Sequence, residues 1–191
     1  MICKEESETV RNILRRNYWR SAMPRAAGAS RPIRRFSELA TRESLRVRSV
    51  LDFGAGNQRD MGFCVGEFHE YTPHDQHAGF GCVQPSSVLE KRYDVVSIVY
   101  VLNVIVKDDR VPVVDFILRK LEQKSTIVIA VRMTDELREV RESWMAFEDG
   151  FVTSRLTYQH FYTPSEVLRS LDGYAKNTTH LGRGTFIVFP N

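Results

Sequence analysis

The chain has 191 residues, 42% of them hydrophobic and 27% charged, with a formal net charge of +3, which is the balance of an ordinary globular protein of about one domain. No apolar run approaches the ~20 residues of a membrane span, and the charged N-terminal segment does not resemble a secretory signal. Three cysteines without Cys-x-x-Cys spacing argue against a disulfide framework or a zinc site. We therefore expect a cytoplasmic protein that binds no metal and no membrane.

The charge is distributed unevenly along the chain. Residues 1–48 hold twelve Lys and Arg against five Glu, whereas the remainder is mildly acidic. A basic segment of this kind predicts a polyanionic partner, with nucleic acid as the first candidate. Tyr18 and Trp19 lie among arginines and could stack on bases. The same aromatic side chains could instead pack this segment against the rest of the protein.

The first part of the chain predicts two helices separated by a break. Residues 5–20 have apolar positions on one helical face, Pro and Gly interrupt the pattern over 21–32, and 33–43 is again helical. We therefore expect residues 1–46 to form a basic helical N-terminal extension. Residues 47–191 would form the main domain.

From residue 47 onward, strand-like and helix-like segments alternate. The predicted strands are 47–53, 67–71, 93–99, 126–131 and 185–189, and the predicted helices are a segment after Asn57, 109–123, 135–147 and 164–171. The inner strands are apolar throughout, which is typical of a parallel sheet covered on both faces. This pattern predicts an α/β, doubly wound, mostly parallel sheet of the Rossmann-like kind. Ligands of such sheets bind beyond the carboxyl ends of the strands.

The first predicted strand runs into the loop Val-Leu-Asp-Phe-Gly-Ala-Gly, residues 50–56. Gly54 and Gly56 allow the backbone to approach a nucleoside cofactor closely, although an ordinary strand-to-helix turn would look similar. The third glycine of a dinucleotide loop is missing, and Asp52 would repel a pyrophosphate. A cationic ligand without phosphate, such as S-adenosylmethionine, suits this loop better than NAD.

A second acidic residue is expected near the end of the next strand, where it would bind the ribose hydroxyls of a nucleoside. Asp75 and Glu70 both lie at a suitable distance along the sequence. We favour Asp75, because Pro73 and His74 should end the strand and leave Asp75 in the loop.

Three further polar residues are candidates for the chemistry. Tyr100 and Asn103 follow the apolar strand at 93–99, where buried polar groups need partners that a ligand could supply. Tyr100 could contact the methionine part of the cofactor or the acceptor, and Asn103 could hold the acceptor or cap local backbone. If the reaction needs a general base, His160 is the candidate, because its segment could cover the acceptor.

Several motifs resemble those of one known family, the DNA phosphorothioation-associated methyltransferases, a branch of the class I S-adenosylmethionine-dependent fold. The resemblance covers roughly residues 30–189 and rests on the segments 30–32, 50–56, 100–105, 149–154, 157–162 and 184–189. It implies a class I methyltransferase fold, S-adenosylmethionine as cofactor, and an acceptor in or around DNA. The glycine loop departs from the family, which continues Arg-Gly-Asp where this chain has Asn57-Gln58-Arg59.

The sequence therefore predicts an S-adenosylmethionine-dependent methyltransferase that acts on nucleic acid or in its modification. It has neither the Asn/Asp-Pro-Pro-Tyr run nor the Pro-Cys dipeptide that marks ordinary base methyltransferases. A protein partner would then supply target recognition. The alternative is a catalytically degenerate module of the same fold that binds nucleic acid or a protein partner.

Overall fold

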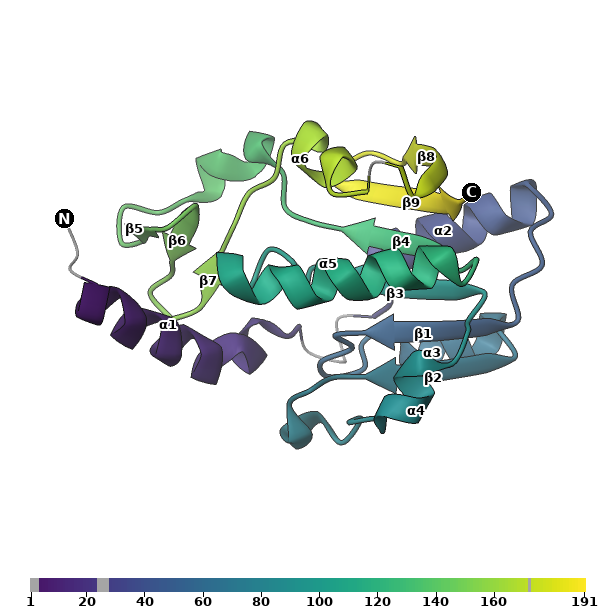
Figure 1. Ribbon diagram of the computed structural model, residues 1–191, viewed down its shortest axis with the longest axis horizontal. Coiled ribbons are helices and arrows are strands. Elements are labelled where there is room, and N and C mark those ends of the chain that lie inside the picture. Colours follow the sequence, from purple (N-terminus) through teal and green to yellow (C-terminus); the bar gives the residue numbers. More distant parts are fainter. Residues whose placement is uncertain (1–3, 24–27, 172) are drawn as a thin grey trace.

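The computed structural model describes residues 4–23, 28–171 and 173–191 (Figure 1). Its helices are α1 (Lys4–Asn17), α2 (Arg31–Arg42), α3 (Met61–Glu67), α4 (Ser86–Glu90), α5 (Lys107–Glu122) and α6 (Pro164–Arg169), with short 3-10 helices η1 (Tyr18–Ser21), η3 (Ala78–Phe80) and η4 (Thr134–Glu139). Its strands are β1 (Ser49–Phe53), β2 (Glu70–His74), β3 (Val95–Val99), β4 (Thr126–Ala130), β5 (Met145–Phe147), β6 (Gly150–Val152), β7 (Tyr158–Gln159), β8 (Ala175–His180) and β9 (Thr185–Pro190).

The central sheet has the strand order β2-β1-β3-β4-β9-β8. The pairs β1–β2, β1–β3 and β3–β4 are parallel, whereas β9 runs antiparallel to both β4 and β8. The predicted α/β class with a mostly parallel sheet is confirmed. The chain leaves β1 toward β2 on one side and later returns to β3 on the other, so the strand order reverses beside β1. A ligand is expected at this switch point.

Helices cover both faces of the sheet, because adjacent strand residues point to opposite sides. Leu51 and Val96 face α5 and α6, whereas Val50 and Val95 face α2 and α3. In Figure 1, α5 crosses the near face and α2 and α3 lie behind the strands. The inner strands thus contribute to two apolar cores, which explains why their sequences are largely apolar.

Helix α2 belongs to the core of the main domain, although it precedes the predicted boundary at residue 46. Ile33 and Phe36 are fully buried against Val50 and Val95 of the sheet. Ser30 precedes the helix, and its hydroxyl donates to Asp60 Oδ2 at 2.7 Å. The basic segment therefore contains one helix that completes the sheet packing and another, α1, that lies at the edge.

Helix α1 packs against a second, three-stranded sheet of order β5-β6-β7 (Figure 1). Leu14 of α1 is fully buried in a cluster with Phe147, Val152 and Tyr158 of this sheet. Helix α1 and the three-stranded sheet lie beside the carboxyl ends of the parallel strands of the central sheet (Figure 1).

The predicted helix over 135–147 is wrong. The structure has the short η4 at Thr134–Glu139 followed by the β5–β6 hairpin. Glu148 adopts a φ of 51° in the turn of this hairpin, and a Cβ at Gly150 would crowd the ring of Tyr158. A tight turn packed on a tertiary neighbour overrides the local helical pattern.

Within the described residues, no helix is long and apolar enough to cross a bilayer.

Candidate functional site

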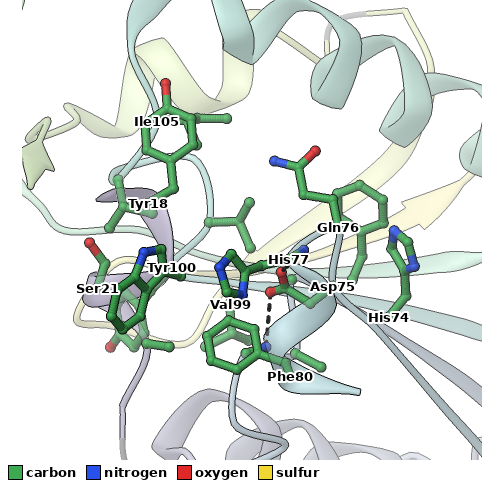
Figure 2. A pocket seen from close by; sticks show the side chains of 18 of the residues that line it. Tyr18, Ser21, His74, Asp75, Gln76, His77, Phe80, Val99, Tyr100 and Ile105 are labelled. Atoms are coloured by element: carbon green, nitrogen blue, oxygen red, sulfur yellow. Dashed lines mark hydrogen bonds between the residues drawn. The ribbon is translucent and has the colours of Figure 1, made fainter. Parts of the chain in front are cut away.

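A cavity of about 580 Å³ lies at the carboxyl ends of β1, β2 and β3, a size typical of small-molecule sites. Its walls come from the loops after these three strands, the first turns of α5, and the segment from α1 to Met23. Figure 2 shows Tyr18, Asp75, His77 and Tyr100 around this space. The cavity therefore occupies the switch point of the sheet, and the N-terminal segment forms part of its wall.

The glycine loop lines the cavity with backbone. Gly54 has a φ of +79° and Gly56 a φ of +51°, a region that residues with a Cβ adopt rarely. The amides of Gly54 and Ala55 donate to the carbonyl of His74 at 2.8 and 2.9 Å, which joins the loop to the end of β2. A Cβ at Gly54 would overlap Val101, so the close approach of these two loops needs glycine.

Asp75 lies in the cavity wall directly after β2, as the sequence predicts (Figure 2). Its Oδ2 accepts a hydrogen bond from the amide of Gly56 at 3.0 Å, and its Oδ1 accepts one from the amide of His77 at 2.9 Å. Each carboxylate oxygen can accept a second hydrogen bond. Glu70 is instead exposed and pairs with Lys91 at 2.6 Å.

Asp52 is the buried acid of the site, with only 5% of its surface exposed. Its Oδ2 accepts a hydrogen bond from the Tyr71 hydroxyl at 2.7 Å. Burial raises the pKa of Asp52 to about 7, because the charged form loses its hydration. The carboxyl group lines the cavity and titrates near neutrality, so its charge can respond to a ligand.

Tyr100 lines the cavity on the β3 side and keeps 36% of its surface exposed. Its φ of 60° is unusual for an aromatic residue, and its amide donates to the carbonyl of Ala130 at 2.7 Å. This backbone conformation turns the chain sharply out of β3. Strain of this kind is often found where a side chain is held for function.

The structure does not bring Asn103 and His160 to the cavity. Asn103 is 2% exposed, its Nδ2 donates to Gln159 Oε1 at 3.2 Å, and its carbonyl accepts from the amide of His160 at 2.8 Å. His160 is 6% exposed, and its Nδ1 lies 2.5 Å from the carbonyl oxygen of Asp149. Burial lowers the pKa of His160, which favours the neutral ring with its proton on Nδ1. Asn103 and His160 join the 100–105 loop to the small sheet outside the cavity wall, and their predicted catalytic roles stay predictions.

The N-terminal segment belongs to the cavity wall, although its sequence did not predict this. Arg15 pairs with Asp109 of α5 at 2.9 Å, and the Tyr18 hydroxyl donates to Asp109 Oδ2 at 2.8 Å. The ring of Trp19 stacks on that of His77 with centroids 5.6 Å apart. Tyr18 and Trp19 were the residues in the sequence that could have indicated this role. In the structure they pack against the rest of the protein, which was one of the two alternatives for these aromatic side chains.

The cavity wall carries more carboxylates than cationic side chains. The acidic residues are Asp52, Asp60, Asp75, Asp108 and Asp109, and the arginines are Arg15 and Arg59. Arg15 is neutralised by Asp109. The interior therefore favours a ligand that carries positive charge or many hydroxyl donors.

No protein-family model and no curated protein matches the chain. Solved structures do match its fold. Streptomyces venezuelae DesVI aligns with a TM-score of 0.60 at 8% identity over 100% of both chains. The sugar N-methyltransferase KedS8 of a Streptoalloteichus species gives 0.57 at 8% identity, over 81% of this chain and 85% of that one.

A third match is the S-adenosylmethionine-bound structure of CalS10, an amino pentose methyltransferase from Micromonospora echinaspora. It has a TM-score of 0.56 at 7% identity and covers 82% of this chain and 89% of that one. The chain thus has the Rossmann-like fold of the class I S-adenosylmethionine-dependent methyltransferases. The resemblance to the phosphorothioation-associated branch is not identified by any of these matches and stays a prediction.

Proposed function

We propose that this protein is an S-adenosylmethionine-dependent methyltransferase that acts on a small-molecule acceptor. One observation carries the proposal. The cavity at the switch point of a class I fold gathers Asp52 from the end of β1 with Gly54, Gly56, Asp75 and Tyr100 from the loops after three neighbouring parallel strands. All five are residues that the sequence predicts for a methyl-donor site.

The residues present fit the donor. Asp75 keeps acceptor capacity for two ribose hydroxyls after its bonds to the amides of Gly56 and His77. The glycine loop presents backbone where a Cβ at Gly54 would overlap Val101. Asp52 offers a carboxylate to a cationic ligand in a buried setting, where charge interactions are stronger than in water.

The donor supplies a methyl group on a positively charged sulfur. Transfer of such a group depends mostly on alignment of donor and acceptor and on exclusion of water. Trp19 and Tyr18 close one side of the cavity, and Tyr100 lies on another. In this proposal Tyr100 contacts the acceptor, and the N-terminal wall keeps water out.

Two ion pairs of α1 support a small acceptor over nucleic acid. Arg11 pairs with Glu148 at 2.5 Å and Arg15 with Asp109 at 2.9 Å, so neither is available to a phosphate backbone. Trp19 is stacked on His77. Two of the matching structures are described as sugar methyltransferases, one acting on an amino pentose and one on a sugar nitrogen.

The test is calorimetric titration with S-adenosylmethionine and S-adenosylhomocysteine. We expect saturable binding of both by the intact protein and its loss in Gly54→Val, because the new side chain would overlap Val101 and φ at this position is positive. Gly66→Ala is the matched control, since a Cβ at Gly66 meets nothing within 4 Å. If the intact protein binds neither ligand, the methyltransferase proposal is wrong and a degenerate module is favoured.

A further inference from the structure

A group of arginines lies beside the cavity and has no role in holding the donor. Arg31, Arg34 and Arg35 stand in the first turn or so of α2, directly after the cavity-lining residue Ser30. Arg183 stands in the turn between β8 and β9. We call Arg31, Arg34, Arg35 and Arg183 the arginine rim.

Hydrogen bonds hold the two parts of the arginine rim together. Arg35 Nη1 donates to the carbonyls of Leu181 and Gly182, the latter at 3.4 Å. The same turn is attached to the sheet, because the amide of Val131 donates to the carbonyl of Gly184 at 3.0 Å. Positive charges from two distant parts of the sequence are thus fixed next to each other.

The rim adjoins the cavity through Ser30, which directly precedes Arg31 and lines the same cavity as Tyr100. The Tyr100 amide is bonded to Ala130, one residue before Val131. Burial raises the pKa of the Tyr100 hydroxyl, and the positive charges of Arg59, Arg132 and Arg31 act against that rise. Arg59 lines the cavity itself, and its Nε donates to the carbonyl of Gly28 at 2.6 Å. The hydroxyl therefore lies within the field of several arginines.

Most of this charge is not neutralised by the protein. Arg132 is paired with Glu136 and Glu139. Within the part of the chain that the structure describes, Arg31, Arg34 and Arg183 form no ion pair, and Arg31 has its pKa lowered by Arg183, then by its neighbours on α2. Like charges held this close oppose folding, so an arrangement of this kind is expected where a ligand relieves the repulsion.

We infer that the acceptor carries a phosphate group, which the arginine rim binds while the rest of the acceptor extends past Tyr100 into the cavity. This inference rests on the proposed function for the meaning of "acceptor". A phosphate or diphosphate can accept from several guanidinium groups at once, whereas a carboxylate is satisfied by one. Several arginines without acidic partners fit the more highly charged group.

The surroundings favour a small phosphorylated molecule over a nucleic acid. The rim is confined to one side of the cavity, and the cavity wall beyond it carries carboxylates such as Asp108 and Asp75. A strand of nucleic acid crossing the opening would place further phosphates against these acids. A compact acceptor places its phosphate on the rim alone.

The experiment is calorimetric titration of inorganic pyrophosphate, at constant ionic strength, into the protein with and without saturating S-adenosylhomocysteine. We expect saturable binding near one site per chain, and a loss of about tenfold or more in affinity in R31Q/R183Q. R42Q is the matched control, because Arg42 ends the same helix, is exposed, and pairs with its neighbour Glu43. The affinity for S-adenosylhomocysteine should be the same in all three proteins.

The outcomes separate this inference from the proposed function. Absence of saturable pyrophosphate binding, while S-adenosylhomocysteine still binds, overturns the phosphate site and leaves the methyltransferase proposal standing. If S-adenosylhomocysteine does not bind but pyrophosphate does, the methyltransferase proposal is overturned and the phosphate site stands. Pyrophosphate is also titrated into the protein without S-adenosylhomocysteine, so the two results are independent. A single-stranded oligonucleotide is titrated in the same way. If it binds more tightly than pyrophosphate, depends steeply on salt, and is weakened as much by R42Q as by R31Q/R183Q, the arginines form a nucleic-acid surface and the small acceptor is wrong.

Discussion

The Tyr18 hydroxyl donates a hydrogen bond to Asp109 Oδ2 at 2.8 Å and so fixes the end of the N-terminal helix to the first turn of α5. The same hydroxyl accepts from the amide of Val106 at 3.1 Å. Arg15 adds an ion pair to Asp109. Burial opposes ionisation of this carboxyl, but the bonds from Arg15 and Tyr18 hold the pKa of Asp109 below its ordinary value. The Asp109 carboxylate thus links the N-terminal wall of the cavity to α5.

Tyr18→Phe removes the donor to Asp109 and the acceptor for Val106. We expect the free energy of unfolding to fall by about 1–3 kcal/mol, because a partly buried amide and carboxylate lose a partner. Hydrogen exchange of the α1 amides should also become faster. Tyr174→Phe is the matched control, since that exposed hydroxyl forms no hydrogen bond with any residue that the structure describes. If both variants change α1 exchange equally, the Tyr18 contact does not hold the wall.

Trp19 should report ligand binding by its fluorescence. The chain has two tryptophans, and Trp19 lines the cavity and stacks on His77, whereas Trp144 is not part of the cavity wall. We expect S-adenosylhomocysteine to change the emission of the intact protein and of Trp144→Phe. The change should disappear in Trp19→Phe. A signal that persists in Trp19→Phe would show that the ligand binds without contact with the N-terminal segment.

The burial of Asp52 predicts a pH dependence of stability. The folded-state pKa of about 7 lies above the ordinary value of 3.8, so the folded protein binds a proton more tightly than the unfolded chain. Stability due to this group is complete below pH 3.8 and is lost as the pH rises through about 7. Asp52→Asn should remove this loss and raise the free energy of unfolding at pH 8 by up to about 4 kcal/mol relative to the intact protein.

Urea unfolding at pH 4, 6 and 8 measures this effect. The exposed Asp135 provides the control variant Asp135→Asn, which makes the same substitution outside the core. If the unfolding free energies of the intact protein and of Asp52→Asn change equally with pH, the raised pKa of Asp52 is contradicted.

His160→Phe separates a contribution of His160 to stability from a contribution to ligand binding. The substitution leaves the carbonyl of Asp149 without its buried donor, so we expect a loss of about 1–3 kcal/mol in unfolding free energy. Affinity for S-adenosylhomocysteine, by titration, should stay within about threefold, since His160 is not part of the cavity wall. The exposed His69 gives the control His69→Phe. If a folded His160→Phe protein loses all affinity for S-adenosylhomocysteine, His160 contributes to the ligand site.

Local patterns in the sequence predicted the parts of the fold that depend on burial and on capping. The strand at Val95–Val99 is apolar because both its faces are covered, and the helix at Pro164–Arg169 begins at Thr163, whose hydroxyl accepts from the amide of Glu166. The glycine loop and Asp75 were likewise predictable, since their spacing follows from strand ends meeting at one edge.

Contacts between distant parts of the chain set the limits of such prediction. Tyr18 and Asp109 are 91 residues apart, and Asn103 and Gln159 are 56 apart. Nothing in the periodicity of either segment indicates these pairings. They decide that the N-terminal helix lines the cavity and that His160 does not.

The packing of Leu14 against Phe147, Val152 and Tyr158 has a consequence for biosynthesis. A chain that emerges from the ribosome in sequence order presents α1 long before its partners on the small sheet exist. The four parallel strands and α5 lie between them and can pair earlier. The ligand cavity should thus form with one wall incompletely packed, and the packing of that wall is complete only after residue 158 has been translated. Until then the apolar face of α1 is exposed, and it is the part of the nascent protein that a chaperone would be expected to cover.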